Sequence, residues 1–492
     1  MHRALQLEEV KTAIGVFLDT TSLIASASCC REWHDSFIPL LWQHLNVQSN
    51  HHIPSAQLEK NKHRILQLTI QSQGNGPYFS INGCSNLTRL ILRASLNTFR
   101  RKKSQYHSWT LIVNNHSSTL KHISLASFRS DDYTEEFCEA VGNCTNLQSL
   151  TVDGYGFPQL LLKACCNITE IEIRRSSIEV QRSTKSSDDQ RNNTRIQHVY
   201  IEEPSSPNGV INFLSLCPAL RYLSWRSFKM LTFPLPRLAS ALVDGTWPQL
   251  EELDVDGYGL KDPELAKALG GINRLVVLAV PNSEFGSGSM ISMGKHLTSI
   301  KTLNLCGCKY VSSSMIQSML CSMTALESLS VGTIKYTDIA EGSAWTSLNL
   351  RRLSISINME NPLFSKSQDK TLTQSGANRD TSFEARQRVV YERLSSLTRL
   401  NVLDIQQPQE CSSLEKSLDL RLISGLGALS SLRKLVNFSF RTTSQEMGMD
   451  EIEWIVNNWT SLRKIGGKFT GNPDNFYKMK RVLNSNGILV YD

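Results

Sequence analysis

The chain has 492 residues, and its 52 basic and 45 acidic side chains give a net charge of +7. This length is too great for one hydrophobic core, so we expect several domains or an extended array of repeats. Hydrophobic residues at 40% and charged residues at 20% are close to globular averages, which excludes a wholly disordered chain. The dilute charge argues against a nucleic-acid partner, and no apolar run approaches the ~18 residues of a membrane span.

The first residues lack the uninterrupted apolar segment of a signal peptide, so we expect the protein in the cytoplasm, the nucleus or both. Its 12 cysteines should then remain thiols. None forms the Cys-x-x-Cys pair of a zinc or redox site, and no cysteine stands beside His44, His51, His52 and His63. We therefore predict no metal and no cofactor.

Residues 1–48 carry three short apolar stripes at helical spacing. Their members are Leu7, Val10, Ile14, Phe17 and Leu18, then Leu23, Ala27 and Cys30, then Trp33, Phe37, Leu40, Leu41 and Trp42. The polar segment Asp19 to Ser22 separates the first two and can cap the second helix. Three helices this short bury little area, so the unit should dock on a neighbour or a partner.

The order of these residues resembles the F-box, the helical module by which substrate receptors attach to the Skp adaptor of cullin-RING ubiquitin ligases. The matching elements are Leu7-Glu8-Glu9-Val10, Ile14, Phe17-Leu18, Leu23, Cys30-Arg31-Glu32-Trp33 and Leu40-Leu41-Trp42, with Glu8 where the family usually has proline. The resemblance implies a Skp-type adaptor, and through it a cullin-RING ligase, as partner. The adaptor-facing residues that it implies are Leu7, Val10, Ile14, Leu18, Leu23 and Trp33. The alternative is a three-helix cap to which the same stripes would belong.

After a linker at 49–62, the triplet apolar-x-x-apolar-x-apolar recurs along the chain. It begins at Ile65, Leu87, Leu120, Leu147, Ile168, Ile196, Leu220, Leu250, Leu275, Ile300, Leu326, Leu350, Leu400 and Leu435. Most successive separations lie between 21 and 28 residues, the usual length of a leucine-rich repeat. Each triplet supplies a short strand, and a helix or irregular segment returns behind it, so only stacking can bury the apolar face.

A second feature supports the same register. Cysteines stand three residues before four triplets, at Cys84, Cys144, Cys165 and Cys217, and asparagines stand one residue before four, at Asn86, Asn146, Asn167 and Asn349. The segment Ile300 to Val311 resembles the cysteine-containing leucine-rich repeat family. The predicted fold is α/β: a leucine-rich-repeat solenoid over 63–470, with a parallel sheet on the concave face and helices on the convex face, preceded by the F-box-like domain.

Two polar stretches interrupt the repeats, one at 181–195 and one in an insertion near 358–392. We interpret them as loops, with binding or phosphorylation segments as the alternative. The last residues, 471–492, are suited to capping the open end of the stack.

The third and fifth positions of each triplet, with the seventh just after, should face away from the core, onto the sheet surface. The middle repeats place charged and aromatic side chains there, the anchor types that interfaces favour. The predicted substrate-binding residues are Glu172, Tyr200, Tyr222, Arg226, Glu252, Asp254 and Asp256.

No phosphate-binding loop, dinucleotide fingerprint, zinc-protease motif or nucleophile elbow occurs in the sequence. We therefore expect no catalysis by this chain. The sequence favours a substrate-recognition subunit of a Skp-cullin-F-box ubiquitin ligase that binds an unknown protein. The alternative is a ligase-independent leucine-rich-repeat scaffold.

Overall fold

A computed structural model describes residues 7–47, 53–72, 81–94, 103–129, 132–154, 161, 167–176, 195–204, 207–226, 235–359, 377–406 and 417–491. Within these ranges, none of the helices has both the length and the hydropathy needed to cross a membrane. The chain divides into two compact units. Unit 1 is Met1–Lys229 with Thr246–Gln249, and unit 2 is Met230–Gly245 with Leu250–Asp492.

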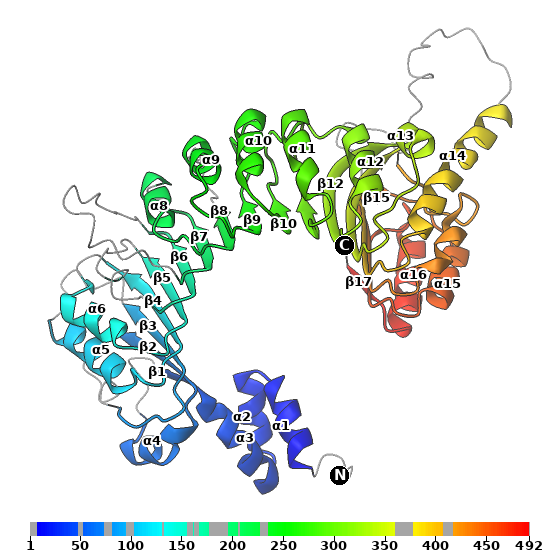
Figure 1. Ribbon diagram of the computed structural model, residues 1–492. Coiled ribbons are helices and arrows are strands. Elements are labelled where there is room, and N and C mark those ends of the chain that lie inside the picture. The colour runs from blue at the N-terminus through cyan, green and yellow to red at the C-terminus, as the bar shows by residue number, and fades with distance from the viewer. Residues whose placement is uncertain are drawn as a thin grey trace. The chain divides into compact units, whose positions relative to one another are not determined.

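Unit 1 begins with three helices and continues as strands and helices in alternation (Figure 1). Its helices are α1 (Glu8–Val16), α2 (Thr20–Ala27), α3 (Arg31–Gln43), α4 (Ser55–Asn61), α5 (Lys103–Asn115), α6 (Glu135–Gly142) and α8 (Pro207–Leu214), with the 3-10 turn η2 (Lys62–Arg64). Its strands are β1 (His44–Val47), β2 (Gln67–Ser72), β3 (Arg89–Ala94), β4 (His122–Phe128), β5 (Ser149–Gly154), β6 (Glu170–Arg174), β7 (His198–Glu202) and β8 (Tyr222–Arg226). Each strand pairs in parallel with the next along the chain.

Unit 2 has the same alternation and the same parallel order, from β9 to β17. Its strands are β9 (Glu252–Val255), β10 (Val277–Ala279), β11 (Thr302–Asn304), β12 (Ser328–Lys335), β13 (Arg352–Asn358), β14 (Val402–Gln406), β15 (Asn437–Ser444), β16 (Lys464–Lys468) and β17 (Leu489–Tyr491). Its helices are α9 (Leu235–Val243), α10 (Asp262–Gly271), α11 (Ser287–Met293), α12 (Ser313–Ser322), α13 (Tyr336–Glu341), α14 (Ala377–Ser395), α15 (Met449–Asn458) and α16 (Pro473–Ser485), with the 3-10 turns η5 (Gly294–His296) and η7 (Leu426–Ser431).

The predicted repeat register is confirmed by the pairing of the strands. Across β5 to β8 the fourth residues of the triplets form one row, Leu150, Ile171, Val199 and Leu223, and the sixth residues form another, Val152, Ile173, Ile201 and Trp225. All fourteen first residues of the triplets are at most 2% exposed. Strands β2 to β15 correspond one to one to the fourteen triplets, so each unit is a leucine-rich-repeat stack with its sheet on one face and helices on the other (Figure 1).

Three strands lie beyond the fourteen triplets. The strand β1 falls inside residues 1–48 and follows directly on α3, while β16 and β17 extend the sheet after Leu435, with β17 inside the segment 471–492. The triplet of β16 starts at Leu462 but has Gly467 where the third apolar residue should stand. The sequence pattern therefore did not identify this triplet. The predicted linker 49–62 contains α4.

The two predicted loops lie mostly outside the described residues. Of the insertion near 358–392, the described part is the end of β13 and the helix α14, which buries Val390, Tyr391 and Leu394. Of the stretch 181–195, only Arg195 is described, and its guanidinium donates a hydrogen bond to Asn167 Oδ1 at 3.0 Å.

The asparagines that precede the triplets link successive repeats. Asn86 Nδ2 donates to the His63 carbonyl at 2.7 Å, and Asn146 Nδ2 donates to the Ser118 carbonyl at the same distance. Asn349 makes the equivalent bond to the Thr324 carbonyl at 2.9 Å. Each acceptor carbonyl lies two residues before the triplet of the preceding repeat, so these asparagines join neighbouring coils.

The aligned cysteines are buried in the same position of three repeats. Cys84, Cys144 and Cys217 are at most 2% exposed, and Cys165 lies outside the described residues. Burial raises the pKa of Cys84 to about 11 and that of Cys144 and Cys217 to about 12. These thiols are therefore structural side chains with very little thiolate at neutral pH.

We expect iodoacetamide at about pH 7 to leave Cys84, Cys144 and Cys217 of the native chain unmodified, because burial and a raised pKa both suppress the reactive thiolate. The exposed Cys29 and Cys30 should react. Peptide mass spectrometry after timed labelling measures this, with the chain in concentrated guanidinium chloride as the control in which every thiol reacts. Labelling of Cys144 at the rate of Cys29 in the native chain would contradict the buried register.

Candidate functional sites

The three N-terminal helices close a small core of their own. Its buried members are Leu23 and Ala27 of α2 and Phe37 and Leu40 of α3. Gly15 lets α1 approach closely, because a Cβ at this position would overlap the side chain of Leu40. The three predicted helices are therefore present, and they bury these side chains against one another.

One side of α1 stays apolar and exposed. Leu7, Val10, Ile14 and Phe17, called here the α1 stripe, follow each other at spacings of three and four residues and so lie on one side of the helix. Leu7 is 55% exposed and Phe17 is 89% exposed, while Val10 and Ile14 are half-buried. Ile24 of α2 is also more than half exposed. Grouped exposed apolar side chains of this kind are typical of a surface that another protein covers.

The six residues expected to face an adaptor fall into two groups. Leu7, Val10 and Ile14 belong to the α1 stripe. Leu23 belongs instead to the helical core, and Leu18 and Trp33 pack against that core. Helical spacing does not say which apolar residue meets the neighbouring helices, and for the same reason the sequence did not single out Phe17 and Ile24 as surface residues. The full exposure of Phe17 is decided by how α1 packs on α3.

Two carboxylates hold these helices in place. Asp19 accepts a hydrogen bond from the Ser22 backbone N–H at 2.7 Å, which caps α2 as predicted and lowers the pKa of Asp19. Glu8, at the position where an F-box usually has proline, accepts a hydrogen bond from Ser36 Oγ of α3 at 2.9 Å. Glu8 also pairs at 3.6 Å with Lys11, whose side chain is only 7% exposed. Glu8 therefore ties α1 to α3 and compensates a buried charge.

The sheet surface of unit 1 brings four of the predicted substrate-binding residues onto adjacent strands. Glu172 of β6 is in register with Tyr200 of β7. The rings of Tyr200 and Tyr222 lie 4.8 Å apart across β7 and β8, and the ring of His198 lies 6.0 Å from that of Tyr222. Arg226 is exposed at the end of β8. These half-buried rings form a rigid aromatic patch, of the type found at interface centres.

The charges beside this patch alternate in sign along one row of the sheet. Asp153, Arg174, Glu202 and Arg226 are in register on β5 to β8. Arg174 donates to Glu172 at 2.8 Å and lies 3.5 Å from Glu202, and the hydrogen bond to Glu172 is the main cause that raises the pKa of Arg174. Because the row is largely neutral as a whole, it favours a partner of mixed polarity over one of a single charge sign.

The three acidic residues predicted to bind substrate lie in unit 2. Glu252 and Asp254 are half-buried on β9, and Asp256 follows the strand. In β10 to β12 the corresponding positions are small or neutral, for example Asn304 of β11 and Ser330 of β12. Four of the seven predicted residues thus form one continuous surface in unit 1, and the other three lie on or directly after the first strand of unit 2.

No known protein-family profile matches this chain, and no characterised protein sequence matches it. Among solved structures, a chain of the TLR13–ssRNA13 complex matches with a TM-score of 0.37 and 11% identity over 93% of this chain. This chain spans 63% of the length of that neighbour. A chain of an octameric complex of Latrophilin 3, Unc5D and the leucine-rich-repeat protein FLRT2 matches with a TM-score of 0.33 and 14% identity, covering 72% of this chain and 86% of that one.

Replacing Glu8 by glutamine should loosen α1. The change leaves Lys11 buried without its carboxylate partner and weakens the bond to Ser36, so we expect a loss of about 1 kcal/mol in the local stability of the helical unit. Hydrogen–deuterium exchange of the α1 amides measures it. The matched control is Glu9→Gln, since Glu9 is exposed. Equal exchange in the two variants would show that Glu8 does not anchor α1.

Proposed function

We propose that this protein is the substrate-recognition subunit of a Skp-cullin-F-box ubiquitin ligase. In this role the N-terminal helices bind the Skp-type adaptor, and the sheet surface of the repeats binds the protein to be modified. The chain contributes no catalytic group, and its partners carry out ubiquitin transfer. The observation that carries the proposal is the α1 stripe: Leu7 and Phe17 at its two ends remain exposed although the helices already close a core with Leu23, Ala27, Phe37 and Leu40.

The order of the helices supports the same role. Their residues match the F-box elements, and the departure at Glu8 replaces proline at the first helical residue with a group that joins α1 to α3. Proline at such a position mainly sets the start of the helix, so a hydrogen-bonded glutamate can stand in its place without breaking α1. The surface that an adaptor would cover is thereby kept.

We expect full-length protein to bind a Skp-type adaptor through the α1 stripe. Leu7→Ala combined with Phe17→Ala should weaken binding at least about tenfold, because both side chains lose their apolar contact area with the partner. Calorimetry with purified adaptor measures the affinity. Val16→Ala is the matched control, since Val16 is 69% exposed on the side of α1 opposite to Leu7. Undiminished affinity of the double variant, or no adaptor binding by the unaltered chain, would reject the proposal.

One observation favours the alternative, a scaffold whose N-terminal helices only cap the stack. The strand β1 follows directly on α3 and pairs with β2, so this end of the chain does cover the first edge of the sheet. Deleting residues 1–43 keeps β1 and removes the three helices. A folded, soluble stack after this deletion supports an adaptor-binding role for the helices, whereas unfolding or aggregation of the repeats identifies a cap.

The second half of the proposal places the bound protein on the aromatic patch of unit 1. Tyr200→Ala with Tyr222→Ala should abolish turnover of the ligase's substrates while adaptor binding is unchanged, because the patch loses its two anchoring rings. Quantitative proteomics of cells that express either variant or the unaltered chain identifies proteins that accumulate. Tyr310→Ala, at a 62% exposed tyrosine of unit 2, is the control. If the double variant and the control leave the same proteins degraded, the patch is not the substrate site.

A further inference from the structure

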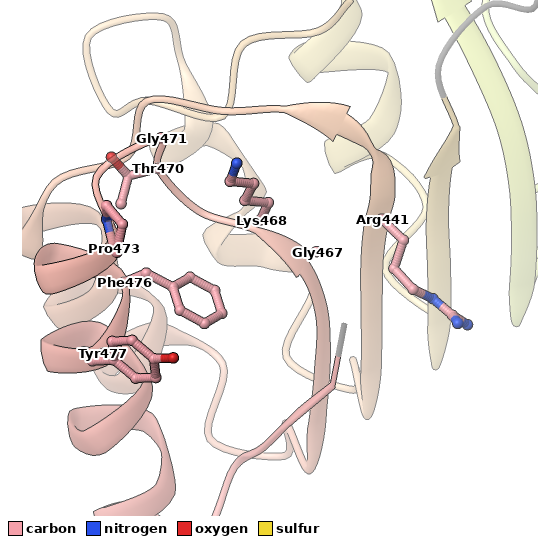
Figure 2. Close-up of a pocket in the computed structure, with 8 residues that line it drawn as sticks. All are labelled: Arg441, Gly467, Lys468, Thr470, Gly471, Pro473, Phe476 and Tyr477. Atoms are coloured by element: carbon pink, nitrogen blue, oxygen red, sulfur yellow. The ribbon is translucent and has the colours of Figure 1, made fainter.

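The C-terminal repeats of unit 2 contain a cavity of about 320 Å³ that the substrate-binding surface does not include. It is lined by Arg441, Gly467, Lys468, Thr470, Gly471, Pro473, Phe476 and Tyr477, which come from β15, β16, α16 and the segment between β16 and α16. Figure 2 shows the rings of Phe476 and Tyr477 directed from α16 toward the strand that carries Gly467, with Lys468 above the ring of Phe476 and Arg441 on the neighbouring strand, its guanidinium directed away from the rings. The sequence predicted the end of the solenoid and the cap at 471–492 in this part of the chain.

Glycine makes room for this cavity. Gly467 has φ of 137°, and a Cβ there would lie 2.5 Å from the ring of Phe440, so only glycine fits between the strand and that ring. The neighbouring Gly466 lies against the ring of Tyr491, where a Cβ would collide as well. Glycine within a strand often marks a place where another group approaches the backbone closely.

Within the part of the chain that the structure describes, neither cation of the cavity pairs with a carboxylate. The side chain of Lys468 forms no ion pair or hydrogen bond there, and the guanidinium of Arg441 is stacked 4.8 Å above the ring of Tyr491. The nearby carboxylates are Glu446, which accepts a bond from Thr470 Oγ1 at 3.4 Å, and Asp474 in the first turn of α16. Neither carboxylate lines the cavity.

The aromatic side chains are partly open to a ligand. Tyr477 is 67% exposed, and Phe476 is half-buried, with its ring 5.6 Å from that of Phe469. An apolar wall beside the ammonium group of Lys468 complements a carboxylate carried next to an apolar group. The volume is at the small end of ligand pockets and accommodates about two side chains.

The edge of the sheet beside the cavity favours a peptide over a free small molecule. Strand β17 pairs with β16 only from Lys464 to Gly466, so Gly467 and Lys468 have no strand neighbour on that side within the described residues. An extended peptide can pair with such an edge while its side chains enter the adjoining cavity.

We propose that this cavity binds an extended protein segment that carries aspartate or glutamate next to an aliphatic or aromatic residue. The carboxylate is held by Lys468, and the apolar side chain packs on Phe476 and Tyr477. The site is a second point of attachment for a partner protein, and it does not depend on the helices of residues 7–47.

A random peptide library displayed on phage and selected on the full-length chain tests the proposal. The enriched peptides should place aspartate or glutamate beside leucine, phenylalanine, tyrosine or tryptophan. Their affinity should fall at least about tenfold in Lys468→Gln with Tyr477→Ala and should decrease with added salt, because a charge-assisted contact and a ring contact are both lost or screened.

Matched controls separate the site from general charge. Lys478→Gln removes an exposed cation of α16 that does not line the cavity, and it should leave the affinity unchanged. Circular dichroism checks that each variant is folded. Absence of enriched peptides, enrichment of basic or neutral ones, or equal binding to the double variant would overturn the proposal. The proposal would also be overturned if calorimetry showed that 3-phenylpropionate binds in the cavity and that the selected peptides do not displace it.

Discussion

The structure depends on one constraint: no single coil of this chain can bury its own apolar face. Each repeat offers a short strand whose first, fourth and sixth triplet residues point inward, and only the next coil in the same register can cover them. The pairing of Leu150, Ile171, Val199 and Leu223 across four strands shows this register directly. Asparagine side chains such as Asn86 and Asn146 reinforce it by joining each coil to the one before.

Because the inward-facing side chains form the core, the side chains on the outer side of the sheet are available for recognition. Most side chains that alternate with the buried ones are only half-buried or exposed, so they are less constrained by packing and can differ from repeat to repeat. In unit 1 these outward-facing positions hold the adjacent rings of Tyr200 and Tyr222 beside a row of alternating charges. In unit 2 they hold mostly small, neutral side chains after the acidic strand β9. The chemistry of the surface therefore changes along the chain although the scaffold does not.

The N-terminal helices bury only some of their apolar side chains. Leu23 and Phe37 close a core, while Leu7 and Phe17 remain exposed, because three short helices offer too little contact area to cover all of them. The C-terminal end shows a related imbalance, since β17 covers only part of β16 and leaves a cavity with two cations beside it. Incomplete burial at these two places in the chain supports the two binding roles proposed for it, one for an adaptor and one for an acidic peptide.

The sequence by itself determined the repeats, their register, the burial of the fourteen triplets and the three helices that precede them. These properties follow from the spacing of apolar residues. Because the same spacing recurs in every repeat, one unusual residue such as Trp225, a buried tryptophan at a triplet position, does not obscure the pattern. Only the tertiary structure decided that Leu23 is a core residue while Phe17 is exposed, that Glu8 bonds to Ser36, and that Lys468 and Tyr477 line one cavity. The physical reason is that spacing specifies which face of an element is apolar, whereas the contacts between elements depend on how their side chains fill the space where they meet.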